Sequence, residues 1–261
     1  AIVAAQLEEP PLDLTVPADR ARWADTLGGT PLGPVSVRLT HAGAVPELAG
    51  FDAGAWWVQD VAATLPVAML GEVRGRRVLD AAAAPGGKTA QLAAAGADVT
   101  ALDLDPARLA LVRQNLARLN LDAETVAADL LDYAAAPFDV VLLDAPCSAT
   151  GTIRRHPDIP WHRSAGDIQS QAALQRRLLD AAARLVKPGG RLVFATCSLE
   201  PEEGEELMAA WLPQAPFTPL PATAPADLGV LKRGPGAFRT LPAAIAGGMD
   251  GFFFTFLERR D

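Results

Sequence analysis

The two cysteines of this 261-residue chain, Cys147 and Cys197, each stand directly before a serine. Each also follows an apolar run that predicts a buried β-strand, at 138–144 and at 191–196. In a parallel sheet the carboxyl ends of the strands share one edge, so we expect the two thiols to lie near each other there. A single cysteine is most often a small buried hydrophobe, but two at equivalent loop positions favour thiol chemistry.

Carboxylates stand at the ends of neighbouring predicted strands. Asp103 and Asp144 are each the last residue of such a strand, and Asp129 follows a third. A single carboxylate at a strand end is as often a solvated cap as a ligand. Three of them, in order along one sheet edge, instead suit S-adenosylmethionine, whose ribose hydroxyls and adenine amino group require hydrogen-bond acceptors.

A loop of small residues, 81–87, follows the predicted strand 77–80 and leads into a helix. Its glycines allow the backbone to approach a ligand closely, and the helix start offers free N–H groups. Residues 87–89 read Gly-Lys-Thr, as at the end of a triphosphate-binding loop, but Ala82 stands where the first glycine of that motif belongs. The three-glycine dinucleotide motif is also absent. S-adenosylmethionine, whose methionine end needs a tight loop here, is therefore the favoured cofactor.

A thiol beside a methyl donor suits methylation of cytosine at carbon 5. That carbon is a poor nucleophile until a thiolate adds to carbon 6 of the ring. An acid that protonates or hydrogen-bonds N3 assists the addition, and afterwards the carbon-5 proton and the cysteine must both leave. Asp144 is the candidate acid, provided that it is protonated or gains its proton from the base. The positions of the two thiols do not tell which of them attacks.

Strands and helices alternate from residue 58 onward. This alternation predicts an α/β fold with right-handed crossovers and a Rossmann-like, doubly wound, mostly parallel sheet. Residues 1–55 are rich in proline and glycine and carry two alternating segments, so we expect a small N-terminal α+β subdomain there and a catalytic domain over 56–261. The expected elements are strands at 12–16, 35–39, 77–80, 98–103, 124–128, 138–144, 191–196 and 251–257, and helices at 58–70, 88–95, 106–120, 169–186 and 202–212.

Composition excludes several classes of function. The chain carries 31 acidic and 23 basic residues, a net charge of −8, which argues against a protein that coats polyanions but leaves room for a local basic groove. No apolar run approaches the ~18–20 residues of a membrane span, so we expect a cytoplasmic protein without membrane contact. Three histidines and two distant cysteines give no zinc spacing, and no metal is expected.

Several motifs together resemble the RNA 5-methylcytosine methyltransferases of the NOL1/NOP2/Sun family, and within it the bacterial enzymes that act on 16S rRNA. Paired P-C-S-x-x-G and T-C-S segments are specific to this family, and the matching stretches occur in order over residues 54–257. These stretches are 54–60, 80–89, 144–151, 154–158, 187–190, 196–198 and 250–253.

The resemblance implies a Rossmann-like methyltransferase that uses S-adenosylmethionine and modifies RNA, with 16S rRNA as the expected partner. It implies that Cys197 is the nucleophile and that Cys147 assists release of the product. It further implies that the cofactor is held by Ala82, Ala83, Ala84, Pro85, Gly86, Gly87 and Lys88 and by Asp103, Asp129 and Asp144.

Two departures from the family pattern stand out. The family usually has a cysteine at the position of Ala82, where alanine suits a loop that binds through its backbone. The bacterial rRNA enzymes usually carry a helical N-terminal RNA-binding domain, of which only a stub at residues 1–6 is expected here. Residues 7–55 then correspond to part of the RNA-binding subdomain that precedes the catalytic fold.

Two other functions remain open at this point. One is methylation of DNA cytosine, whose enzymes use the cysteine that follows proline, here Cys147. The other is a non-catalytic RNA-binding or assembly factor that keeps the fold, which the intact thiols and carboxylates disfavour. For RNA contact the candidates are basic side chains near the catalytic loops and near the C-terminus, and three tryptophans that stack on bases or belong to the core. They are Arg154, Arg155, His156, Arg163, Arg176, Arg177, Lys232, Arg233, Arg239, Trp56, Trp57 and Trp161.

Overall fold

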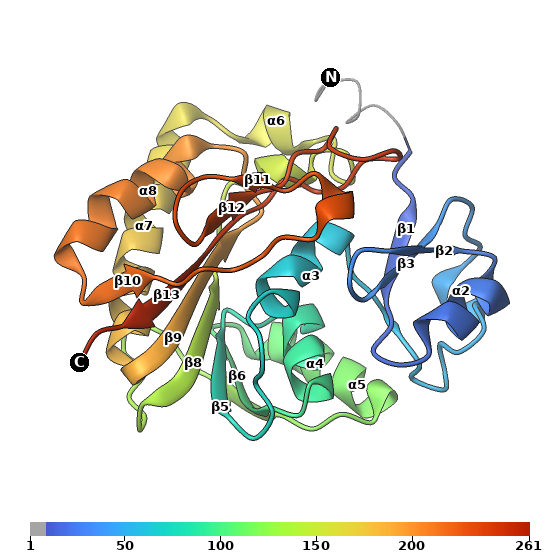
Figure 1. The fold of residues 1–261 in the computed structure, drawn as a ribbon, viewed down its shortest axis with the longest axis horizontal. Coiled ribbons are helices and arrows are strands. Elements are labelled where there is room, and N and C mark those ends of the chain that lie inside the picture. The colour runs from blue at the N-terminus through green and yellow to red at the C-terminus, as the bar shows by residue number, and fades with distance from the viewer. Residues whose placement is uncertain (1–8) are drawn as a thin grey trace.

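A large sheet forms the centre of the computed structural model, which describes residues 9–261 (Figure 1). The expected stub at residues 1–6 lies outside the described residues. The sheet has nine strands in the order β11-β12-β13-β9-β8-β5-β6-β7, with β10 beside β13. Strands β5 to β9 are parallel, whereas β13 runs antiparallel to β9. The chain passes from β5 outward to β7 and then returns to β8 on the other side, which creates a crevice for ligands between β5 and β8.

The helices and strands have the following bounds. The strands are β1 Leu12–Thr15, β2 Thr30–Leu32, β3 Ser36–Leu39, β4 Trp57–Val58, β5 Arg77–Ala81, β6 Asp98–Asp103, β7 Glu124–Ala127, β8 Phe138–Asp144, β9 Val186–Thr196, β10 Phe217–Pro219, β11 Leu231–Lys232, β12 Ala237–Arg239 and β13 Phe253–Arg259. The α-helices are α2 Arg20–Leu27, α3 Val61–Ala68, α4 Gly87–Ala94, α5 Pro106–Leu119, α6 Ile159–His162, α7 Ala165–Arg184 and α8 Glu205–Trp211.

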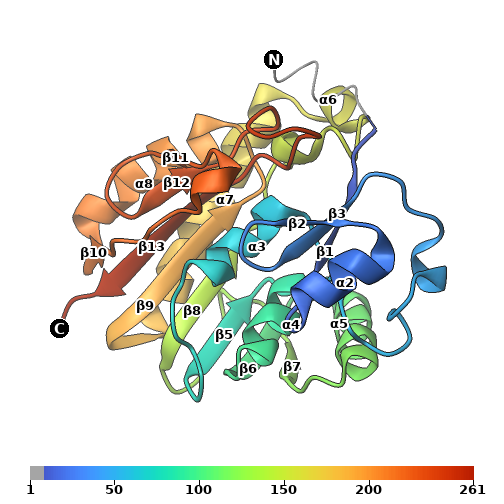
Figure 2. The same cartoon turned by 45° about the vertical axis from the view of Figure 1, so that its right-hand side comes forward.

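Both faces of the large sheet are covered by helices (Figure 2). Alternation along β8 shows the division, because Val141 and Leu143 pack in the cluster that contains α7 and α8, while Val140 and Leu142 pack in the cluster that contains α3. A strand buried on both faces in this way reads as a continuous apolar run, which is why β8 was recognisable in the sequence. Among residues 9–261, no helix is both long and apolar enough to cross a membrane.

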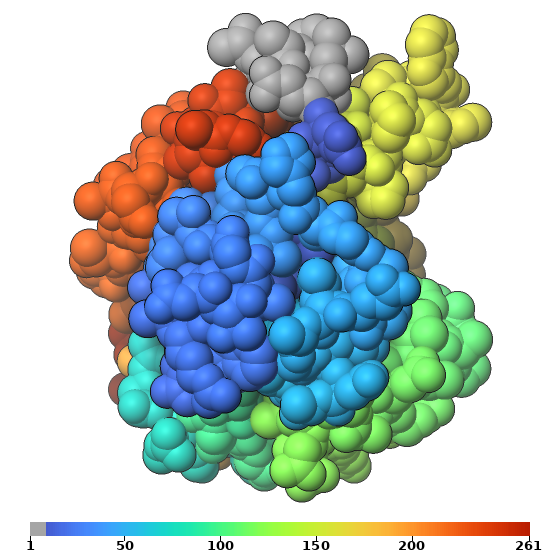
Figure 3. Space-filling view, turned by 90° about the vertical axis from the view of Figure 1, so that its right-hand side faces the viewer, coloured from blue at the N-terminus to red at the C-terminus, as the bar shows by residue number. Residues whose placement is uncertain are grey.

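A second, four-stranded sheet in the order β2-β3-β1-β4 lies at the N-terminal end, beside α2. A buried ion pair within it makes contacts to the rest of the chain. Asp13 on β1 accepts two hydrogen bonds from Arg38, at 2.7 and 2.8 Å, and a third from the backbone N of Val61 at the start of α3. Arg38 also donates to the carbonyl oxygen of Ala246. In the space-filling view this blue unit lies between the yellow segment around α6 and the green segment around α5 (Figure 3).

Several expected boundaries were wrong by two or more residues, and local hydrogen bonds explain two of them. The helix expected at 202–212 begins only at Glu205, after a 3₁₀ turn at Pro201–Glu203, and the strand expected at 251–257 runs from Phe253 to Arg259. The helix expected at 58–70 begins only at Val61, because Asp60 caps it by accepting from the backbone N of Ala62. The helix expected at 169–186 begins four residues earlier, because Ser164 and Asp167 form a capping box. The strand expected at 191–196 extends back to Val186, with an irregular register opposite β8. Among residues 9–261, no group of three or more His, Cys, Asp or Glu side chains could hold a metal ion.

Candidate functional site

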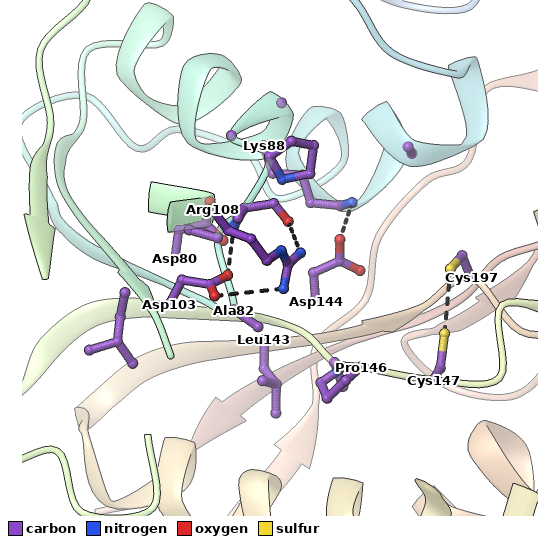
Figure 4. Close-up of a pocket in the computed structure, with 18 of the residues that line it drawn as sticks. Asp80, Ala82, Lys88, Asp103, Arg108, Leu143, Asp144, Pro146, Cys147 and Cys197 are labelled. Atoms are coloured by element: carbon purple, nitrogen blue, oxygen red, sulfur yellow. Dashed lines mark hydrogen bonds and ion pairs between the residues drawn. The ribbon is translucent and has the colours of Figure 1, made fainter. Parts of the chain in front are cut away.

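A cavity of about 760 Å³ lies at the carboxyl ends of the central parallel strands (Figure 4). Its walls come from the loops after β5, β6, β7, β8 and β9 and from α4. All of the side chains and loop residues proposed from the sequence for cofactor binding or catalysis line this one cavity. The structure therefore brings the proposed residues together, while their individual roles stay predictions.

The loop from Ala82 to Lys88 offers its backbone to the cavity. Ala82 has a φ of 63° and Gly86 a φ of 102°, so the loop turns through the left-handed region twice. A Cβ added at Gly86 would approach Val112 of α5 to 3.1 Å, so glycine also permits close packing of the loop on that helix. Alanine at position 82 accepts the left-handed conformation at a cost of roughly 1–2 kcal/mol.

Asp103 ends β6 and is almost fully buried. Its carboxylate accepts hydrogen bonds from the backbone N of Ala84 at 3.0 Å and of Asp105 at 3.1 Å, and Arg108 lies 3.6 Å away. These contacts fix the carboxylate on the cavity wall, as expected for an acceptor of ribose hydroxyls. Asp129 also lines the cavity, and one of its oxygens accepts from the backbone N of Leu131 at 2.9 Å.

Asp80, at the end of β5, is a site residue that the sequence reasoning did not single out. It is 1% exposed, and Thr89 donates to its Oδ2 at 2.6 Å, while its Oδ1 has no hydrogen-bond partner. Burial raises the pKa of Asp80 to about 7, against the lowering effects of Thr89 and Lys88. Asp80 lines the cavity, and a buried carboxylate oxygen that lacks a partner fits a cationic ligand group, such as the ammonium of a bound methionine moiety.

Lys88 and Asp144 form an ion pair across the cavity, with Nζ and Oδ2 2.6 Å apart. Burial disfavours the ammonium of Lys88, but the neighbouring Asp144 outweighs this effect, so the pKa of Lys88 is raised above its ordinary value. The pairing was not predicted, because the two residues are 56 positions apart in the chain. Lys88 also lies over the ring of Phe252, 5.1 Å from its centroid.

The two thiols face each other, with their sulfur atoms 3.4 Å apart. Their loops pack backbone to backbone, since the N of Gly151 donates to the carbonyl oxygen of Cys197 at 3.0 Å. A Cβ at position 151 would lie 1.9 Å from the carbonyl oxygen of Gly251, so only glycine fits. The glycine of the P-C-S-x-x-G segment is thereby explained by its close contact with the chain at Gly251 and, at 2.9 Å, with the carbonyl oxygen of Cys197.

The environment distinguishes the two thiols. The hydrogen bond with Cys197, followed by burial, raises the pKa of Cys147 well above its ordinary value. Cys147 therefore keeps its proton and is the natural S–H donor of the pair. Lys88 and Arg155 lie close enough to interact electrostatically with a thiolate at Cys197. The role of Cys197 as the attacking sulfur stays a prediction.

The structure corrects part of the expected RNA-contact set. Arg154 is buried and pairs with Asp60 and Asp250, so it is not available to bind phosphate. Asp60 also caps α3, so Arg154 connects the loop after Cys147 to that helix.

Arg239 is buried as well and pairs with Glu205. Of the three tryptophans, Trp56 and Trp57 belong to the core, whereas Trp161 is 85% exposed. Arg155 lines the cavity and retains 41% exposure of its side chain.

Known proteins are similar to this chain in sequence and in fold. Residues 67–258 match the family model described as 16S rRNA methyltransferase RsmB/F. Ribosomal RNA small subunit methyltransferase B of Vibrio cholerae is 44% identical over 222 residues, which cover 83% of this chain and 49% of that protein. The chain thus spans about half the length of the curated relatives it matches.

Two solved structures from Pyrococcus horikoshii are similar to this chain over most of its length. A methyltransferase homolog protein has a TM-score of 0.82 and 30% identity, and the match covers 99% of this chain and 89% of that one. NSun6 with SFG has a TM-score of 0.74 and 26% identity, and the match covers 87% of this chain and 60% of that one. These structures and the strand order confirm the predicted Rossmann-like fold.

Proposed function

Because the chain belongs to the 16S rRNA methyltransferase RsmB/F family, we propose that it transfers a methyl group from S-adenosylmethionine to carbon 5 of a cytidine in RNA. The RNA that we propose is 16S rRNA, in line with the family description. The observation that carries the proposal is the pair of thiols 3.4 Å apart at the edge of the cavity, next to the Lys88–Asp144 pair. A methyltransferase that acts on a stronger nucleophile needs no thiol at all.

The cofactor fits the half of the cavity between β5 and β6. S-adenosylmethionine, when bound, supplies an electrophilic methyl group. Asp103 is the proposed acceptor for the ribose hydroxyls and Asp129 for the adenine amino group, since both line the cavity. The partnerless Oδ1 of Asp80 is suited to the ammonium of the methionine end, and the backbone of 82–88 encloses that end.

The other half of the cavity activates the base. The Cys197 thiolate adds to carbon 6 of cytosine, and the ring electrons move toward N3 and carbon 5. Lys88 and Asp144 hold a proton between Nζ and Oδ2, and we assign to this pair the protonation or hydrogen bonding of N3. After methylation, carbon 5 gives its proton to solvent water, the electron pair of that C–H bond forms the carbon-5–carbon-6 double bond, and the bond to Cys197 breaks with its electrons leaving on sulfur. N3 returns its proton to the Lys88–Asp144 pair. The Cys147 S–H stabilises the departing thiolate by donating to it.

RNA binding is proposed to depend on a restricted surface around the cavity, since the net charge of the chain is −8. Trp161 on α6 is exposed, and the next-but-one residue, Arg163, donates to the carbonyl oxygen of Ser148 beside Cys147. An exposed indole at this position suits stacking on an unpaired base near the target cytidine, which must leave its helix to reach a thiol.

The proposal is tested by trapping the covalent complex. Radiolabelled methyl groups from S-adenosylmethionine are followed into 16S rRNA fragments and into DNA of the same sequence, with denaturing gels to detect protein–nucleic acid adducts. We expect transfer to RNA only, no adduct with Cys197→Ser, and adduct accumulation with Cys147→Ser. Adduct loss with Cys147→Ser and retention with Cys197→Ser would reverse the roles, transfer to DNA would favour the alternative substrate, and no transfer at all would favour a non-catalytic factor.

A further inference from the structure

The serines that follow the two cysteines meet at a single buried side chain, Glu203. Ser148 donates to Glu203 through both its backbone N, at 2.9 Å from Oε1, and its hydroxyl, which contacts Oε2. Ser198 donates its hydroxyl to the same Oε2 at 2.5 Å. The hydroxyls of the two serines are themselves 3.1 Å apart. The shared Cys-Ser pattern of the two loops thus has a common structural partner.

A third element completes this arrangement. Gln175 on α7 donates through Nε2 to Oε1 of Glu203 at 2.9 Å and to the carbonyl oxygen of Pro146 at 2.9 Å. Pro146 directly precedes Cys147, so α7 holds the loop from the other side. The carboxyl group of Glu203 therefore ties the loop after β8, the loop after β9 and a helix to one point.

The burial of the Glu203 carboxyl group carries a desolvation cost in free energy. Its residue is 0% exposed, and no Lys or Arg within residues 9–261 forms an ion pair with it. A buried carboxyl group without a cation is tolerated only when hydrogen bonds satisfy its oxygens, as the two serines and Gln175 do here. Apolar packing would hold two loops together at less expense of free energy, but with less precise placement.

We propose that Glu203 is the positioning residue that holds Cys147 and Cys197 at the separation needed for addition to the base and for elimination. It touches neither thiol and acts through Ser148 and Ser198. The expected effect on the rates of adduct formation and release rests on the proposed function, whereas the expected effect on the distance between the two thiols does not. For this reason the two are measured separately.

Glu203 has a second influence on the same pair. In addition to the hydrogen bond with Cys197 and to burial, the negative charge of Glu203 contributes to the raised pKa of Cys147. A thiol that stays protonated is available as a donor to the Cys197 sulfur. The residue that fixes the distance therefore also favours the S–H form of Cys147, which elimination requires.

The geometric test uses dibromobimane, a reagent that becomes fluorescent only when both of its ends have alkylated thiols. The chain has two cysteines, so fluorescence reports cross-linking of Cys147 to Cys197 without any background. In Glu203→Leu the two serines and Gln175 lose their common acceptor at nearly unchanged side-chain volume, and the loops should separate. We expect about tenfold less cross-link at equal total alkylation, since small displacements strongly reduce intramolecular reaction. Glu202→Leu, at an exposed neighbour, serves as the matched control and should cross-link like the wild type.

The kinetic test separates the two loops. Ser198→Ala loosens the nucleophile loop and should lower the rate of adduct formation with RNA. Ser148→Ala loosens the other loop and should leave adduct formation intact while adduct accumulates. In both variants kcat should fall about tenfold, while KM for S-adenosylmethionine stays within about twofold. A side chain that only stabilised the fold would not produce this division between formation and release.

Wild-type cross-linking in a folded Glu203→Leu variant would overturn the proposal. If that variant does not fold, as judged by near-ultraviolet circular dichroism, the two serine variants decide, because each removes only one side of the arrangement. Cross-linking at the wild-type level in both of them would equally overturn it. Failure of the proposed function would leave every variant and the wild type without methyl transfer, but would not restore the lost cross-link.

Discussion

The two sides of the cavity are built in different ways. On the cofactor side, between β5 and β6, the carboxylates of Asp80 and Asp103 stand at strand ends, and their partners Thr89 and Ala84 are 9 and 19 positions away. On the thiol side the decisive contacts join residues much farther apart in the chain. Ser148 and Glu203 are separated by 55 positions, and Arg154 and Asp250 by 96.

The two sides of the cavity therefore depend on different levels of structure. The cofactor side follows from the edge of a parallel sheet, where strand ends and glycine-rich turns meet whatever lies around them. The thiol side depends on tertiary contacts from α7, the turn at Pro201–Glu203 and the loop before β13. Changes on one side should therefore leave the other side largely intact.

The largest effect is expected for Cys197→Ala. Methyl transfer to RNA should fall at least about 10⁴-fold, because covalent activation of the base is lost. The affinity for S-adenosylmethionine should change less than about twofold, since the cofactor side keeps all of its contacts. Methyl transfer and calorimetric titration with the cofactor measure the two quantities. A parallel loss of cofactor affinity would contradict the independence of the two sides.

The second prediction concerns how the thiol side is anchored. Arg154→Met leaves Asp60 without its buried cation and should lower the free energy of unfolding by about 3–5 kcal/mol. Arg176→Met, which removes a partly exposed pair with Asp180, is the control and should cost less than about 1 kcal/mol. Urea unfolding of both variants makes the comparison. Equal losses in the two variants would show that the Arg154 network does not anchor the loop.

The same contrast explains what could be read from the sequence. The apolar run of β8 and the strand ending in Asp103 were predictable, because burial on both faces leaves a local pattern. The sheet edge at which both thiols lie was predictable for the same reason. The partner of a side chain leaves no such pattern. Arg154 was therefore expected to face RNA, although its partners Asp60 and Asp250 bury it. Glu203 was assigned only to a helix, and its three partners became visible only in the fold.

The third prediction addresses the cofactor side alone. Asp103→Asn removes the proposed anionic acceptor for the ribose and should weaken binding of S-adenosylmethionine about 100-fold, or about 2.7 kcal/mol. Cross-linking of the two thiols by dibromobimane should remain at the wild-type level. Asp98→Asn, at the exposed opposite end of the same strand, is the matched control and should bind normally. Reduced cross-linking in Asp103→Asn would mean that the cofactor side also positions the thiols.

The smallest effect concerns Asp80, whose carboxylate lies on the cofactor side with a pKa raised by burial to about 7. The ammonium of the cofactor pairs with the ionised form, so below pH 7 the carboxyl group must first lose its proton. The affinity for S-adenosylmethionine should therefore increase about tenfold between about pH 5.5 and 7.

In the cofactor-free protein, the contribution of Asp80 to the free energy of unfolding decreases as the pH rises. A raised carboxyl pKa stabilises the fold fully below the ordinary value of 3.8, and this contribution is lost as the pH rises through about 7. Asp80→Asn should make both profiles flatter and bind the cofactor weakly at every pH. Cys197→Ala, which changes only the thiol side, serves as the control, and its binding profile should match that of the wild type. Lys88 and Asp144, which also interact with Asp80, stay unchanged in this variant. A pH-independent affinity in the wild type would remove Asp80 from the set of cofactor ligands and leave the backbone of 82–88 as the only holder of the methionine end.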